Sequence, residues 1–128
     1  MHKNRLFLYN YAAELKVAGD YRESLKIASE CEKLWADYEL QMLIAENHLQ
    51  KEQHKQAENH YHKASLMYPV KFMPLYRLYQ LYRIAGDEEN ELIMAEKILS
   101  KPIKVASPTI HQMKQEVKQS LNKKETFQ

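Results

Sequence analysis

The segment AENHYHKASLMYP, residues 57–69, decides the fold because it combines a helical spacing with a defined end. Ala57, Tyr61 and Ala64 follow one another at spacings of four and three residues, so a helix places them on one face. A face of small residues with one aromatic suits a helix that another helix approaches closely. Pro69 ends the helix, since proline has no backbone N–H and restricts the residue before it. If this pattern recurs at a fixed period, it marks a repeat.

Turn positions recur along the chain at a nearly constant distance. Gly19 and Glu52 are 33 residues apart, and Glu52 and Gly86 are 34 residues apart. Each position lies in a polar turn between two helical patterns. The period is that of the tetratricopeptide repeat (TPR), a helix–turn–helix unit of about 34 residues. The chain resembles this family over nearly its whole length.

The resemblance predicts an all-α fold, an α-α superhelix of the TPR-like type with three helix-turn-helix repeats and a C-terminal capping helix. In the second repeat, helices are expected at residues 38–50 and 55–67. The expected divisions are TPR repeat 1 at residues 5–37, TPR repeat 2 at 38–71, a divergent TPR repeat 3 at 72–102, a linker and capping helix at 103–122, and a frayed tail at 123–128.

The first and third repeats match the TPR pattern less closely than the second. In the first, Tyr11 and Ala12 supply the large–small pair of the family, and we expect Tyr11 in the core. In the third, Tyr79 replaces the small residue of the first helix and Glu91 replaces the early alanine of the second. The packing of this third helical pair is therefore the part that the pattern defines least.

The sequence of the C-terminal segment predicts a separate helix. An extended link is expected over residues 103–106, followed by Ser107 as the N-cap and Pro108 at the first helical position. One apolar stripe then follows at helical spacing: Ile110, Met113, Val117 and Leu121. A helix with one apolar face and polar residues elsewhere suits the open end of a repeat stack.

The composition and the motifs argue against three classes of function: nucleic-acid binding, membrane insertion and catalysis. The net charge is only +2, with 19 basic and 17 acidic residues, so nucleic-acid binding is not expected. The longest apolar clusters are far shorter than the ~20 residues of a membrane span, so this segment is not expected to insert into a membrane. Cys31 falls at a position that is usually a small buried alanine, which favours inert packing over a nucleophile. No phosphate-binding glycine loop is present, and we expect no catalytic residue and no cofactor.

A metal site is not expected either. The histidines of the second repeat are His48, His54, His60 and His62, with gaps of six, six and two residues. A zinc-binding pair on one helix needs a gap of four, which brings both imidazoles to one face.

The tyrosines and arginines of the first helices could form a stacking surface for single-stranded nucleic acid, but the near-neutral net charge of the chain favours core and inner-face roles for them.

The TPR resemblance implies a partner-binding groove lined by the first helix of each repeat. Carried over residue by residue, the groove candidates are Tyr9, Ala13, Lys16, Met42, Glu46, Leu49, Met73, Tyr76, Gln80 and Arg83. Methionine and tyrosine suit adaptable binding of a protein or peptide, and self-association or cover by a larger chain are the alternatives. TPR grooves that clamp a C-terminal carboxylate have lysine and asparagine where this chain has Tyr9 and Ala13, so that function is not expected.

Four longer phrases carry a narrower resemblance: LFLYNYAAEL (6–15), DYELQMLIAEN (37–47), YPVKFMPLYRLYQLYRIAG (68–86) and ILSKPIKVASPTIHQMKQEV (98–117). They look like the C-terminal repeat region of bacterial O-antigen ligase/polymerase-type membrane proteins. The resemblance implies a non-catalytic, soluble tail of an inner-membrane protein in surface polysaccharide assembly, on a side of the membrane left open. A free-standing cytoplasmic TPR scaffold or regulator is the alternative.

Overall fold

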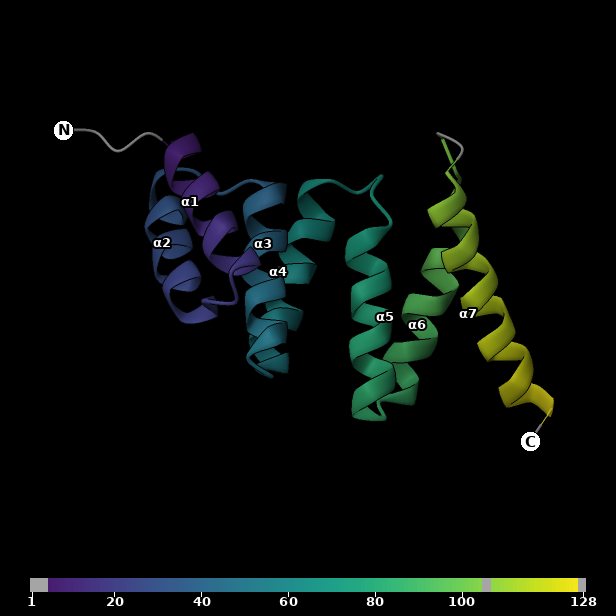
Figure 1. The fold of residues 1–128 in the computed structure, drawn as a ribbon. Coiled ribbons are helices and arrows are strands. Elements are labelled where there is room, and N and C mark those ends of the chain that lie inside the picture. Colours follow the sequence, from purple (N-terminus) through teal and green to yellow (C-terminus); the bar gives the residue numbers. More distant parts are fainter. Residues whose placement is uncertain (1–4, 105–106, 127–128) are drawn as a thin grey trace. The chain divides into compact units, whose positions relative to one another are not determined.

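The computed structural model describes residues 5–104 and 107–126. This described part contains seven α-helices and no strand (Figure 1). The helices are α1 (Arg5–Val17), α2 (Tyr21–Leu34), α3 (Tyr38–Gln50), α4 (His54–Met67), α5 (Met73–Ala85), α6 (Glu88–Ser100) and α7 (Pro108–Thr126). None of these described helices is long and apolar enough to cross a membrane. The bounds of α3 and α4 agree with the expected helices of the central segment to within one residue.

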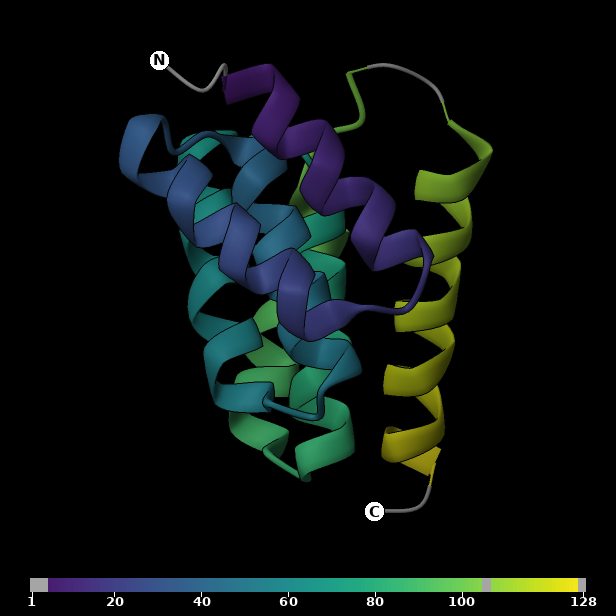
Figure 2. The ribbon, with the colours of Figure 1, turned by 60° about the vertical axis from the view of Figure 1, so that its left-hand side comes forward.

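The chain divides into two compact units. Unit 1 comprises Met1–Pro69 and contains α1 to α4, and unit 2 comprises Val70–Gln128 and contains α5 to α7. Within unit 1, each helix packs against the next, and α1 also contacts α3 (Figure 2). Within unit 2, α5 packs against α6, and α6 packs against α7. Consecutive helices joined by short turns therefore form helix–turn–helix pairs in both units.

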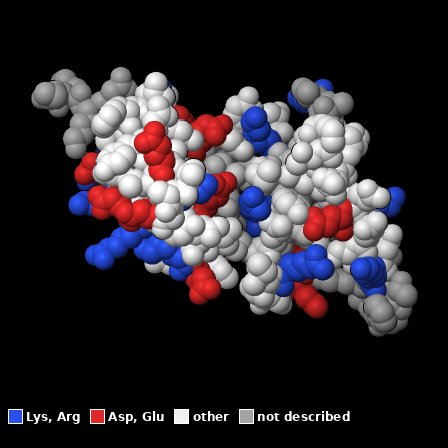
Figure 3. All heavy atoms as spheres, viewed as in Figure 1, with Lys and Arg blue, Asp and Glu red and all other residues white. Residues whose placement is uncertain are grey.

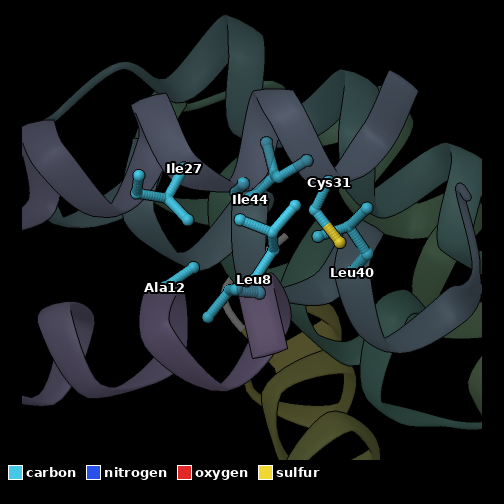
Figure 4. Close-up of a cluster of buried hydrophobic side chains, with 8 residues drawn as sticks. Leu8, Ala12, Ile27, Cys31, Leu40 and Ile44 are labelled. Carbon is cyan, nitrogen blue, oxygen red and sulfur yellow. The ribbon is translucent and has the colours of Figure 1, made fainter. Parts of the chain in front are cut away.

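Three helices of unit 1 enclose an apolar core. Side chains from α1, α2 and α3 point toward one another there (Figure 4). The buried members are Leu8, Ala12, Ile27, Ala28, Cys31, Leu40, Leu43 and Ile44. Each fully buried large aliphatic side chain stabilises the unit by roughly 1.5–3 kcal/mol relative to its exposed state. The thiol of Cys31 is 1% exposed and fills space among these side chains, as the sequence predicts.

The segment 57–69 behaves as its spacing predicts. Ala57, Tyr61 and Ala64 are all 0% exposed, and α4 carries them against α3. The small alanine side chains allow the two helices to approach, while the tyrosine ring fills the space between them. The helix ends at Met67, two residues before Pro69.

Left-handed turn residues separate the two helices of each pair. Gly19 has φ 85° and Gly86 has φ 73°, a backbone region that glycine enters without steric cost. Glu52 holds the equivalent place in the middle pair with φ 59°, at a cost of about 1 kcal/mol for a residue with a Cβ. Asp20 and Asp87 follow the two glycines and cap the next helices, since their carboxylates accept the N–H groups of Glu23 and Asn90.

The structure corrects two expectations. Tyr11 is 41% exposed, so it is not a core residue; its ring lies 6.3 Å from that of Phe7 on the outer side of α1. Helix α7 begins at Pro108 as predicted but continues to Thr126, beyond the expected start of a frayed tail at 123. The last part of the expected link (residues 105–106) and the last part of the tail (residues 127–128) lie outside the described residues.

The divergent positions of unit 2 are buried. Tyr79 is 1% exposed on α5, and Glu91 is 5% exposed on α6.

Helix α7 is held through its predicted apolar face, on which Met113 and Val117 are buried. The Lys114 ammonium donates to the backbone carbonyls of Leu99 and Lys101. A cation at the C-terminal carbonyls of a helix is favourable, so Lys114 stabilises the contact of α7 with the end of α6.

Candidate functional site

Helices α1 and α3 of unit 1 form a shared surface. They are the first helices of consecutive pairs and contact each other directly. The Lys16 ammonium on α1 lies 2.5 Å from the Glu46 carboxylate on α3, and both side chains are less than one third exposed. Two groove candidates from different helices are therefore brought together, and their charges compensate each other.

The other groove candidates of unit 1 differ in exposure. Tyr9, Ala13 and Leu49 are half-buried, which leaves part of each side chain open to a ligand. Met42 is only 7% exposed, so it packs inside the protein and is not an open groove contact. The helical position alone suggested exposure for Met42, whereas its burial depends on the neighbours that the folded chain places around it.

The groove candidates of unit 2 lie on α5. Met73, Tyr76 and Gln80 are half-buried and Arg83 is exposed. The Tyr76 hydroxyl donates to the Glu116 carboxylate of α7 at 2.5 Å. Its polar end is thus already bound by the C-terminal helix, a contact that the sequence did not predict.

A pocket opens at the end of unit 1 where α1 begins, α2 ends and α3 begins. Its volume is about 170 Å³. Leu6 and Trp35, which are 62% and 53% exposed, form apolar walls with Tyr9. Cys31 and Leu40 are both 1% exposed and lie at its base. Of the groove candidates in the sequence, Tyr9 lines this pocket.

Charged residues surround the apolar part of this pocket. The Arg5 guanidinium lies 4.3 Å from the centre of the Trp35 ring, which is a cation–π contact. The Asp37 carboxylate accepts the Leu40 N–H at 2.9 Å and caps α3. Glu39 also lines the pocket, and no described lysine or arginine forms an ion pair with it. The TPR pattern does not single out Trp35 as a site residue, although a single tryptophan between two helices is a useful signal for an exposed anchor.

The carboxylates make the surroundings of two tyrosines acidic. Partial burial, followed by the charges of Glu39 and Asp37, raises the pKa of the Tyr9 hydroxyl above its ordinary value. Partial burial and then Glu39 and Glu46 raise the pKa of Tyr38 to about 12. Both hydroxyls are therefore weaker acids than an ordinary tyrosine, and at neutral pH they remain hydrogen-bond donors.

A chain of polar side chains crosses α2, α3 and α4. The Gln41 amide donates to the Glu32 carboxylate at 2.7 Å, which turns its carbonyl oxygen toward His60 Nδ1, also at 2.7 Å. His60 must therefore carry its proton on Nδ1. Its ring stacks on that of His48, with centroids 5.6 Å apart and an interplanar angle of 18°. Spacing along one helix could not predict this pair, because the two rings come from different helices.

Burial lowers the pKa of His60 in this stacked pair. The pKa of His60 is lowered first by burial and then by the charge of Lys63, with a smaller effect from His48; Glu32 acts in the opposite direction. Within residues 5–104 and 107–126, no three His, Cys, Asp or Glu side chains gather closely enough to hold a metal ion. The two imidazoles are accounted for as hydrogen-bonded packing residues.

Comparisons with known proteins identify the fold. No protein-family model matches the chain, and no curated protein matches its sequence. Among solved structures, a chain from a structure titled "CopN-Scc3 complex" is similar to it, with a TM-score of 0.76 and 16% sequence identity. The match covers 88% of this chain and 66% of that chain. At this identity the likeness shows the fold, which is all-α and TPR-like, with helix–turn–helix pairs and a C-terminal helix.

Proposed function

We propose that this chain is a non-catalytic protein-binding module, which holds a segment of a partner protein on the α1–α3 surface of unit 1. The observation that carries the proposal is the Lys16–Glu46 pair, which joins α1 to α3. By helical spacing, half-buried Tyr9 and Ala13 share the face of Lys16 on α1, and half-buried Leu49 shares the face of Glu46 on α3. Tyr9 also lines the pocket at Trp35. A partner covering this surface would bury apolar atoms and would not leave either charge of the pair alone.

Two further observations support protein binding. Tyrosine and tryptophan are enriched at the centres of protein interfaces, because each offers a large rigid surface and a polar donor. The similar solved chain comes from a structure titled as a complex, so a protein of this fold is found with a partner. The sequence also allows self-association as the mode of binding, and crosslinking distinguishes a second copy of this chain from a different partner protein.

The binding surface is tested with a photo-crosslinking amino acid placed at Leu49 on the proposed surface. The matched control carries it at Leu66 of α4, which is 80% exposed. In cells of the source organism, we expect a discrete adduct from position 49 and none from position 66. An adduct with the mass of two chains would identify self-association, and a heavier one would be identified by mass spectrometry. Equal adducts from both positions, or none, would contradict the proposal.

We further propose that the module is the C-terminal tail of an O-antigen ligase/polymerase-type inner-membrane protein. The phrases at 6–15, 37–47, 68–86 and 98–117 support this context. The alternative is a free-standing cytoplasmic scaffold. An immunoblot of fractionated source cells separates the two: a large band in the inner-membrane fraction is expected for a tail. A soluble band near the 15.3 kDa of this chain would contradict the membrane context and favour the scaffold.

A further inference from the structure

The pocket at the end of unit 1 permits a statement about the ligand. We propose that it binds one apolar side chain of the partner, next to a lysine or arginine that pairs with Glu39. This inference rests on the proposed function, since it names the chemistry of the segment that the α1–α3 surface holds.

The size of the pocket fits a side chain. Its volume of about 170 Å³ lies below the roughly 300–1,000 Å³ that small-molecule and cofactor sites occupy. It is large compared with the roughly 30 Å³ that one water molecule takes up in the liquid. Cys31 and Leu40 make an apolar base, so an aliphatic or aromatic side chain would exchange water for carbon and sulfur contacts there.

The walls are also apolar and are exposed in the free chain. Leu6 and Trp35 each leave more than half of their surface open. Together with Tyr9, they surround the mouth of the pocket. Large exposed apolar side chains around a concavity are typical of interaction sites, whereas single scattered ones are ordinary surface.

The charges around the mouth favour a basic neighbour. Among the described lining residues, Arg5 is the basic one, and its guanidinium is stacked on Trp35. Asp37 is engaged at the N-terminus of α3. Glu39 is exposed, and none of the described basic residues forms an ion pair with it. On the face shown in Figure 3, the described residues in the upper part of unit 1 are mostly uncharged or acidic, and most of the basic side chains of this unit lie lower down. An acidic segment would be repelled here, whereas a lysine or arginine would be attracted.

The single tryptophan makes the pocket directly observable. Because Trp35 is the only tryptophan of the chain, its fluorescence reports ligand binding at this place. The probes are short capped peptides with leucine next to lysine, leucine next to glutamate, or alanine next to lysine. We expect saturable emission changes with the leucine–lysine peptide. The other two peptides should bind about tenfold more weakly, since one loses the charge pairing and the other loses the apolar contact.

Substitutions at position 39 test the charge assignment. Glu39→Gln should weaken leucine–lysine binding several-fold and reduce its dependence on salt, and Glu39→Lys should reverse the preference in favour of leucine–glutamate. The matched control is Glu89→Gln, which removes an acid from the first turn of α6 outside the pocket and should leave binding unchanged. Circular dichroism verifies that each variant keeps its helices.

The outcomes separate this inference from the proposed function. If Glu39→Lys still prefers the leucine–lysine peptide, or if no peptide changes the Trp35 emission while Leu49 still crosslinks a partner, the pocket assignment is wrong and the module stands. If neither Trp35 nor Leu49 reports any ligand, both proposals are wrong.

Discussion

The Lys16 ammonium and the Glu46 carboxylate join the first helices of two consecutive helical pairs, at 2.5 Å. The residues are thirty positions apart in the sequence, and each is satisfied by the other. We expect Lys16→Met and Glu46→Gln each to lower the free energy of unfolding of unit 1 slightly, with a coupling of about 0.2–1 kcal/mol in a double-mutant cycle. Urea unfolding followed by Trp35 fluorescence measures it. The control is Lys26→Met, on the exposed side of α2. If the effects of the two single substitutions add up to that of the double variant, the ion pair contributes nothing to the free energy of unfolding.

Ser24 connects three helices through buried hydrogen bonds. Its hydroxyl donates to the Ala12 carbonyl at 2.7 Å and accepts from the Asn47 amide at 2.9 Å. Ser24→Ala removes both bonds inside the core and should destabilise unit 1 by about 1–3 kcal/mol. The control is Ser65, whose hydroxyl donates to the His62 carbonyl of the same helix. Ser65→Ala should lower the free energy of unfolding much less than Ser24→Ala does. Equal urea midpoints for the two variants would show that the buried network is not stabilising.

Ala64 leaves no room for a charged side chain. It is 0% exposed on the face of α4 that packs against α3. Ala64→Glu would bury an unpaired carboxylate, and the cost is comparable to the total stability of about 5–15 kcal/mol of a small domain. We therefore expect unit 1 to unfold, with loss of helical circular dichroism and a red shift of Trp35 emission. Leu66→Glu at an exposed position of α4 is the control; a normal melt for Ala64→Glu would overturn the helical register.

His60 should make the stability of unit 1 depend on pH. Burial and Lys63 lower its pKa below 6.5 in the folded chain, so the unfolded chain binds the proton more tightly. The stabilisation is complete above pH 6.5 and is lost as the pH falls from that value through the folded-state pKa. His60→Gln should remove this part of the pH dependence, whereas His111→Gln on the exposed side of α7 should not. Urea unfolding between neutral and acidic pH measures the difference, and parallel curves for wild type and His60→Gln would contradict it.

Tyr76 holds α7 through its bond to Glu116. Tyr76→Phe keeps the ring and removes the donor, so we expect faster amide exchange in α7 and a loss of about 1 kcal/mol or less, because the bond is exposed. The pKa of the hydroxyl is raised from 10.0 to about 12, by partial burial and then by Glu116. The stabilisation is therefore present below pH 10 and is lost as the pH rises through about 12. Tyr21→Phe is the control, and unchanged exchange in α7 would show that the bond does not hold the helix.

Helix existence and helix ends were readable from the residues. The spacing of Ala57, Tyr61 and Ala64 defined the buried face of α4, and Ser107 followed by Pro108 located the start of α7. These signals are local, because a helix presents residues three and four apart on one face whatever it packs against. The all-α, TPR-like class followed from the period of the turns.

The arrangement of side chains from different helices needed the folded chain. Met42 shares a helical face with Glu46 yet is buried, and His48 meets His60 across two helices although no spacing links them. The pocket at Trp35 likewise draws its walls from three helices and the turn between two of them. Periodicity specifies which face of a helix is apolar, but the crossing and register of neighbouring helices decide which faces meet. The helices are therefore a property of the local sequence, and the candidate site is a property of their packing.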